Sequence, residues 1–211
     1  MKRWLVLLIP VMLVLAGCAG GTSEQLPLAP SEPTAEGPRE LRVMAYSSFD
    51  ISETVIEAFE AEHNAKVLFL DAGDTGQMVS QAILSKENPQ ADVLYGVDNT
   101  FLSRALEGDI FEVYAAENLA SVPDAYQLDP EHRVTPVDYG DVCLNYNRAY
   151  FADSGLAVPE RLEDLIKPEY QGSLVVENPA SSSPGLAFLL ATISTFGEDG
   201  YLDYWRALRA N

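Results

Sequence analysis

The sequence predicts an α/β fold with a mostly parallel sheet covered by helices on both faces. Between residues 41 and 107, short apolar runs alternate with segments that have helical spacing. These runs are apolar throughout instead of alternating with polar residues, which is typical of strands that are buried on both faces. Strands that alternate with helices favour a parallel sheet with helical crossovers.

The elements of this first part follow from local patterns. The expected strands are residues 41–46, 65–70 and 92–95. Helices are expected around residues 55–59 and 78–83 and over residues 99–107, because their apolar side chains recur on one helical face. Asp50 stands three residues before Glu53, the spacing of a capping box, and is expected to begin the first helix.

The pattern changes after residue 108, where short apolar pieces are separated by prolines up to residue 136. The elements expected next are an extended run at 137–146, a helix at 160–166, a strand at 173–176, a helix at 183–196 and the start of another helix at 201–210. One strand and two or three helices make a poor core, so we interpret the chain as truncated.

The N-terminus has the pattern of an export signal. Lys2 and Arg3 precede an apolar run of about 13 residues, which suits a signal peptide and is short for a membrane span. The ending Leu-Ala-Gly-Cys resembles a bacterial lipobox, so residues 1–17 are expected to be removed and Cys18 lipidated. A plain secretory signal that ends by chance in cysteine is the alternative. Residues 18–40, rich in Pro, Gly and Ser, are expected to form a flexible tether.

The composition restricts the possible functions. Without Lys2 and Arg3 the chain keeps 11 basic and 32 acidic residues, a net charge of −21. Such a surface repels nucleic acid and anionic lipid headgroups. Cys143 is expected in the core as an unpaired thiol, and His63 and His132 lie in polar segments. We therefore predict no catalytic residues, no metal site and no cofactor.

Five motifs in order resemble the thiamine-binding members of the substrate-binding lipoproteins of bacterial ABC importers. They are VMAYSSF at 43–49, GDT at 73–75, ADVLYGVDN at 91–99, PVDYG at 136–140 and NPASSSPGL at 178–186. Each is weak alone, but the five occur in order and are spread over residues 43–186, most of the stretch 41–211.

The resemblance implies a type II periplasmic-binding-protein fold, the Venus flytrap, with the first lobe largely present and the second lobe incomplete. The first lobe would span residues 41–137, and residues 138–211 would hold a crossing strand and the start of the second lobe. Such proteins are monomers that close around thiamine or its phosphates and deliver the ligand to an ABC permease. The resemblance thus implies a binding protein, not an enzyme, that is exported and lipid-anchored at a membrane, in the periplasm or on the outer face of the cytoplasmic membrane.

Asp74 and Thr75 align with residues of the family that line the cleft. Asp74 lies in a strand-to-helix loop, where ligands meet open α/β sheets. Its carboxylate could hydrogen-bond the aminopyrimidine of thiamine or offset the charge of the thiazolium. The alternative for Asp74 is a helix N-cap without contact to a ligand.

Ser182 and Ser183 also align with ligand-contacting positions. Ser183 is expected to be an N-cap, with Pro184 at the first helical position. Free N–H groups and the helix dipole would then favour a phosphate or hydroxyethyl oxygen. Capping alone needs one serine, so the run of three favours a ligand site, with ordinary capping as the alternative.

Three further residues are assigned by the resemblance. Tyr46 aligns with a tyrosine of the cleft and could stack on a cationic heterocycle, or it is a core residue at a strand end. Asp138 and Tyr139 mark the first crossing between the lobes, or Tyr139 is an ordinary edge-strand aromatic. Tyr95 and Asp98 are interpreted as structural.

The sequence also departs from the family. Family members have a tryptophan after the first strand, whereas here Phe49-Asp50-Ile51-Ser52 leads straight into the helix. Their remaining cleft aromatics come after residue 211, so the 211 residues alone are expected to bind thiamine poorly. The alternatives kept open are ferric iron or a polyamine on the same scaffold, and, from other classes, an exported enzyme using Asp74 and Asp98 or a structural lipoprotein.

Overall fold

The computed structural model describes residues 37–211. The expected signal peptide, Cys18 and most of the expected tether lie outside the described residues, and so they stay predictions.

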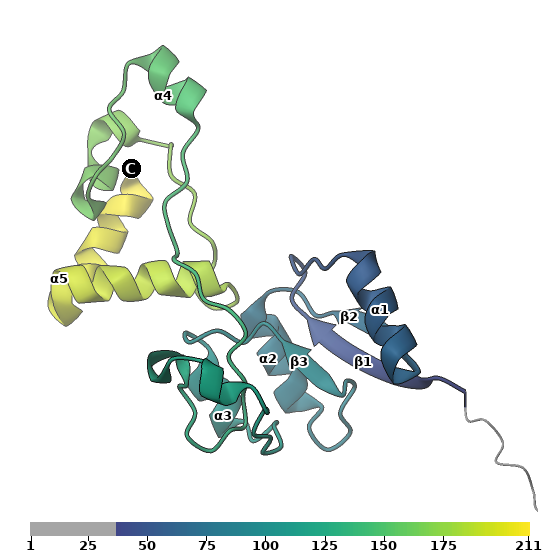
Figure 1. Cartoon of the computed structure of the whole chain (residues 1–211). Coiled ribbons are helices and arrows are strands. Elements are labelled where there is room, and N and C mark those ends of the chain that lie inside the picture. Colours follow the sequence, from purple (N-terminus) through teal and green to yellow (C-terminus); the bar gives the residue numbers. More distant parts are fainter. Residues whose placement is uncertain (1–36) are drawn as a thin grey trace, which may run out of the picture. The chain divides into compact units, whose positions relative to one another are not determined.

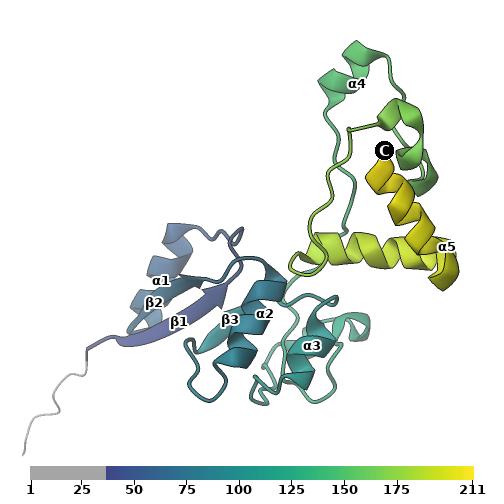
Figure 2. The ribbon, with the colours of Figure 1, turned by 180° about the vertical axis from the view of Figure 1, so that it is seen from behind.

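Three parallel strands form the sheet, in the order β2-β1-β3 (Figure 1). β1 is Arg39–Ala45, β2 is Ala65–Asp71 and β3 is Val93–Tyr95. Helices α1 (Glu53–His63) and α2 (Thr75–Leu84) connect them. The crossover from β1 to β2 and the crossover from β2 to β3 run across the sheet in opposite directions, and right-handed crossovers therefore place α1 and α2 on opposite faces (Figures 1 and 2). The predicted parallel α/β sheet is confirmed.

The well-packed face of the sheet is the one that α2 covers. Met44 in β1 lies opposite Leu70 of β2 and Leu94 of β3 in the strand register. These side chains pack with Met78 of α2, whose side chain is fully buried. Because side chains alternate along a strand, one row of β1–β3 supplies this core.

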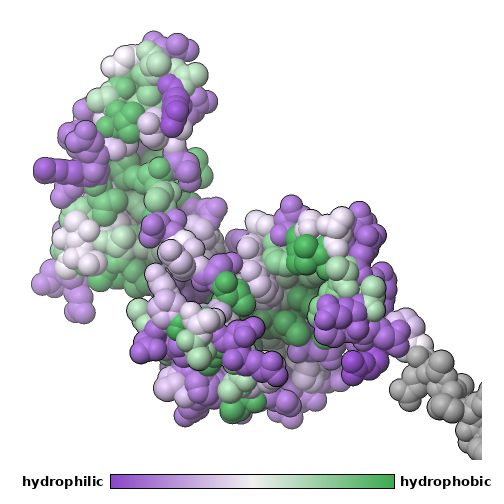
Figure 3. Space-filling view, viewed as in Figure 1, coloured by the Kyte–Doolittle hydropathy of each residue, from purple (hydrophilic) through white to green (hydrophobic). Residues whose placement is uncertain are grey.

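The opposite face is less covered than the sequence predicts. Phe69 and Val93 belong to the other row of side chains and are 41% and 43% exposed. Helix α1 packs on β2 and contains no buried residue, and it begins after the N-cap Ser52 instead of Asp50. Exposed hydrophobic side chains are visible among hydrophilic ones in Figure 3. Burial of the strands on both faces is therefore not observed within residues 37–211.

Helix α3 (Leu102–Glu107) is shorter than predicted because Asp98 holds the preceding residues in a turn. The Thr100 hydroxyl donates to Asp98 Oδ1 at 2.9 Å. Phe101 and Ala105 then pack against Val79 of α2 and form a second core cluster, which Leu186 joins.

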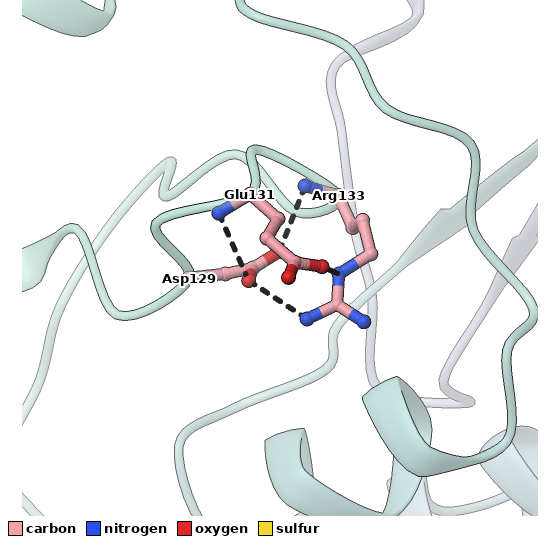
Figure 4. Close-up of polar contacts among 3 residues, drawn as sticks. All are labelled: Asp129, Glu131 and Arg133. Atoms are coloured by element: carbon pink, nitrogen blue, oxygen red, sulfur yellow. Dashed lines mark hydrogen bonds and ion pairs between the residues drawn. The ribbon is translucent and has the colours of Figure 1, made fainter.

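Residues 109–136 contain an ion pair between the buried Asp129 and the partly buried Arg133. Asp129 is only 4% exposed and receives two hydrogen bonds from the Arg133 guanidinium, at 3.0 and 3.2 Å (Figure 4). The backbone N–H groups of Arg133 and Glu131 also donate to this carboxylate, at 2.8 and 3.3 Å. The hydrogen bonds from Arg133 are the main cause that lowers the pKa of Asp129 to about 2.

This ion pair gives a pH-dependent prediction. A lowered pKa means that Asp129 adds stability above about pH 4, and that this contribution is lost as the pH falls towards 2. We expect Asp129→Asn to lower the free energy of unfolding by about 1–3 kcal/mol at pH 7. Denaturant unfolding of both proteins at several pH values measures the difference, which should shrink near pH 2. A difference independent of pH, or one equally large in the exposed control Asp199→Asn, contradicts the assignment.

Residues 138–211 contain two α-helices. α4 is Arg148–Ser154, and α5 is Ser183–Ala210 with a kink at Gly197, where φ is 72°. The helices predicted at 183–196 and 201–210 are confirmed as the two arms of α5. The helix predicted at 160–166 is a short 3-10 helix instead, Leu162–Ile166. The remaining 3-10 helices are Leu119–Ser121, Asp124–Tyr126 and Pro168–Tyr170.

Two predicted strands in this part do not form. Residues 137–146 and 173–176 are in no strand, because no strand of the described part lies alongside to pair with them. Val175 is 91% exposed, and Cys143 is exposed rather than buried in a core as expected. The crossing strand predicted around Asp138 is therefore an irregular segment.

Among residues 37–211, no helix has the length and hydrophobicity needed to cross a bilayer.

Candidate functional site

The loops that follow the three strands meet at one edge of the sheet, because parallel strands end on the same side. We call residues 46–49, 71–76 and 95–98 at these ends the sheet edge. Two hydrogen bonds link its first two loops: Ser47 N–H donates to Gly73 O at 2.9 Å, and the Ser47 hydroxyl donates to Asp71 Oδ1 at 2.7 Å. The Gly73 N–H and the Ser47 hydroxyl lower the pKa of Asp71.

Asp74 and Thr75 lie at the start of α2, as the sequence predicts. Asp74 is the exposed N-cap residue, and its N–H donates to Gln77 Oε1 at 3.1 Å. Thr75 is buried and its hydroxyl donates to Gly96 O at 3.1 Å, which ties α2 to the loop after β3. The structure thus leaves the Asp74 side chain at the surface of the edge and uses the Thr75 hydroxyl to hold the loops together.

Aromatic rings gather at the sheet edge around Tyr95, the last residue of β3. Tyr46 stacks on Tyr95 with ring centroids 6.5 Å apart and planes at 17°. Phe49 lies 4.7 Å from Tyr95 and 5.5 Å from Phe69 between ring centroids. Gly96 is needed here, since its φ is 109° and a Cβ would lie 2.2 Å from Tyr46 Cδ1. The predicted cleft residue Tyr46 is therefore half-buried in a cluster with Tyr95, which was expected to be only structural.

The predicted crossing residues lie next to this cluster. The Tyr95 hydroxyl donates to Asp138 Oδ2 at 3.2 Å, and partial burial together with the Asp138 charge raises the pKa of Tyr95. Tyr139 is 77% exposed and stacks on Tyr126 with centroids 4.8 Å apart. Asp138 is thus joined to the sheet edge, while Tyr139 points to a different neighbour.

The serine loop, residues 177–183, contacts the sheet edge at the start of α2. Gly76 N–H donates to Ser181 O at 2.8 Å. The approach is so close that a Cβ on Gly76 would lie 2.8 Å from Ala180 O and 2.8 Å from the Phe101 ring. The two stretches predicted to bind ligand, Asp74-Thr75 and Ser182-Ser183, are therefore neighbours across this hydrogen bond.

The N-cap of helix α5 lies one residue earlier than predicted. It is Ser182, not Ser183, and the Ser182 hydroxyl accepts from Gly185 N–H at 3.2 Å. The same hydroxyl donates to a Glu177 carboxylate oxygen. Ser182 is 2% exposed, so its side chain is fully engaged within the serine loop.

Ser183 has a different environment. Its hydroxyl oxygen is buried and has no hydrogen-bond partner among residues 37–211. A buried hydroxyl without a partner costs free energy, and native proteins usually satisfy such groups. The Ser183 hydroxyl thus leaves its hydrogen-bonding capacity unused within the described residues.

The charges around the sheet edge and the serine loop are all negative. No Lys or Arg of the described chain forms an ion pair with the carboxylates there, which are Asp71, Asp74, Asp98, Asp138 and Glu177. Within the same residues, no three His, Cys, Asp or Glu side chains are grouped as metal ligands. The arrangement favours a cationic organic molecule, because carboxylates and aromatic faces both attract cations.

The structure adds Tyr95, Gly76 and Glu177 to the residues of this region. Gly76 carried a usable signal, since it directly follows the Gly-Asp-Thr motif at the start of a helix. The sequence held no signal for Glu177, because its contact with Ser182 depends on the turn between the two residues. Tyr95 ends an apolar strand, and nothing in the local sequence predicts that its hydroxyl contacts Asp138.

Comparison with known proteins assigns the family. Residues 88–211 match the family described as bacterial extracellular solute-binding protein. The thiamine-binding periplasmic protein of Salmonella typhimurium is 27% identical over 175 residues, 81% of this chain and 51% of that protein. The protein of the same name in Escherichia coli is 26% identical over 164 residues, 75% of this chain and 48% of that protein. The chain thus spans about half the length of these relatives.

Solved structures show a similar fold. The periplasmic binding protein AfuA from Actinobacillus pleuropneumoniae, solved with exogenous fructose-6-phosphate bound, has a TM-score of 0.61 at 26% identity, over 80% of this chain and 54% of that one. A periplasmic thiamin binding protein has a TM-score of 0.60 at 22% identity, over 82% and 55%. The apo ferric ion-binding protein A of Pasteurella haemolytica has a TM-score of 0.54 at 20% identity, over 82% and 53%. The predicted periplasmic-binding-protein fold is confirmed, with about half of it in this chain.

Proposed function

This chain belongs to the bacterial extracellular solute-binding proteins, and we propose that the full-length protein captures thiamine or a thiamine phosphate for an ABC permease. The hydrogen bond from Gly76 N–H to Ser181 O carries the proposal. It joins the exposed Asp74 at the start of α2 to the serine loop, and these are the stretches that align with ligand-contacting positions. The relatives named as thiamine-binding proteins support the choice of ligand.

The chemistry of the sheet edge suits this ligand. Thiamine combines a positively charged thiazolium with an aminopyrimidine. The Asp74 carboxylate can accept from the exocyclic amine or offset the ring charge. Tyr46 offers an aromatic face to a cationic ring, and the Ser183 hydroxyl can bond the hydroxyethyl oxygen. Binding, closure and release need no bond to be made or broken, so the proposed role is transport and not catalysis.

The export route is part of the proposal. The family is extracellular and the relatives are periplasmic, which supports export of this chain. The expected tether ends earlier than residue 40, because Arg39 and Glu40 already belong to β1. We propose in addition that Cys18 carries the lipid anchor and that residues 18–38 tether a monomeric binding protein to the membrane beside its permease.

Calorimetric titration of the full-length protein tests the ligand. Thiamine is expected to bind with a dissociation constant in the micromolar range or below, as evolved capture requires. Ferric citrate and spermidine, titrated separately, represent the other ligands open to this scaffold. Saturable binding of either of them without binding of thiamine contradicts the proposal.

A further inference from the structure

We infer that Glu177 makes the serine loop reject phosphate, so that the protein selects free thiamine over its phosphate esters. This inference rests on the proposed function and narrows its ligand. It starts from the hydrogen bond between the Ser182 hydroxyl and the Glu177 carboxylate, at the first turn of α5.

The start of α5 has few donors left for an anion. A helix N-terminus binds phosphate through several free backbone N–H groups. Here Pro184 has no N–H, and the N–H of Gly185 donates to the Ser182 hydroxyl at 3.2 Å. The N–H of Ser182 is also used, donating to Asn178 O at 2.9 Å. Of these first groups, only the N–H of Ser183 has no partner among residues 37–211.

The Glu177 carboxylate is itself a negative group at the N-terminus of α5. It bonds the N-cap hydroxyl, where the helix dipole favours a negative group. No Lys or Arg of the described residues pairs with Glu177. A phosphate at the same helix end would meet a like charge without a compensating cation, and such juxtapositions cost binding free energy.

The polar groups of Ser183 that are left without a partner at the start of α5 suit a neutral alcohol. Ser183 offers its N–H together with a buried hydroxyl oxygen that has no partner in the described part of the chain. One donor and one hydroxyl match the single hydroxyl at the end of the hydroxyethyl group of thiamine. A phosphate ester at that atom would need more donors and a positive charge.

The test compares thiamine with thiamine diphosphate on the full-length protein by calorimetry. The wild type is expected to bind thiamine at least about tenfold more tightly than the diphosphate. Glu177→Gln keeps an oxygen that can accept from the Ser182 hydroxyl, so α5 should still start at the same residue. This variant should reduce the preference about tenfold, because removing the like charge should strengthen binding of the diphosphate relative to thiamine.

Glu198→Gln, an exposed position beyond the kink of α5, is the matched control and should leave the preference unchanged. A wild type that binds the diphosphate as tightly as thiamine overturns the inference. So does a preference that Glu177→Gln leaves intact. Either result keeps thiamine as the ligand, whereas a folded wild type that binds neither compound overturns the proposed function and this inference together.

Discussion

Replacing Gly76 with alanine in the full-length protein is expected to destabilise the fold and to weaken ligand binding at once. The new Cβ would lie 2.8 Å from Ala180 O and 2.8 Å from the buried Phe101 ring. One of these neighbours is backbone and the other is packed in a core cluster, so neither can move freely. Overpacking of this kind costs about 1–3 kcal/mol.

The loss of binding has the same cause. To make room for the methyl group, the serine loop must move away from α2, which lengthens the bond between Gly76 N–H and Ser181 O. Ser183 and Asp74 would then no longer face the same ligand. Denaturant unfolding measures the first effect, and thiamine titration measures the second.

Gly200→Ala is the control for the backbone change. Gly200 lies inside α5, and its Cβ would meet only Phe196 Cβ at an ordinary 3.4 Å. Alanine there should raise stability by about 0.5–1 kcal/mol, since glycine is unfavourable in a helix. If Gly76→Ala is as stable and binds as well as the wild type, the close approach of the serine loop to α2 is wrong.

Asp74→Asn is expected to weaken thiamine binding by about 10–100-fold, because a charge-assisted hydrogen bond is worth about 1.5–3 kcal/mol. Asparagine is as good an N-cap as aspartate, so α2 should begin at the same residue and stability should change by only about a few tenths of a kcal/mol. The variant thereby separates the two roles open to Asp74. Calorimetry gives the affinity, and thermal unfolding gives the stability.

Glu57→Gln removes the same charge from the exposed surface of α1 and serves as the control. Its effect on affinity should be small, because charges at exposed surfaces are screened by water and salt. Equal losses in Glu57→Gln and Asp74→Asn would mean that overall charge, and not contact with Asp74, governs binding. A large loss of stability in Asp74→Asn without a loss of affinity would leave Asp74 as a cap only.

The strands and helices of the first part could be predicted because their signals are local. The apolar runs at Ala65–Asp71 and Val93–Tyr95 and the helical stripe around Met78 each fix their own element. Their order along the chain then fixes the parallel sheet and brings the loop ends to one edge. The place of Asp74 beside this edge follows from that topology alone.

Other features depend on neighbours that a local pattern does not contain. Residues 137–146 have the composition of a strand, but a strand also needs a partner, and none pairs with it in the part of the chain described. Cys143 lies in this segment and is therefore exposed. The N-cap of α5 is Ser182 and not the predicted Ser183, because Glu177 fixes the Ser182 hydroxyl. This contact joins residues five apart across a turn.

A crystal structure of the full-length protein grown with thiamine tests the central claim most directly. The thiazolium or aminopyrimidine ring should lie beside Tyr46 and Asp74, and the hydroxyethyl oxygen should bond Ser183. Thiamine bound elsewhere, with Asp74 and Ser183 both in contact with solvent, would contradict it.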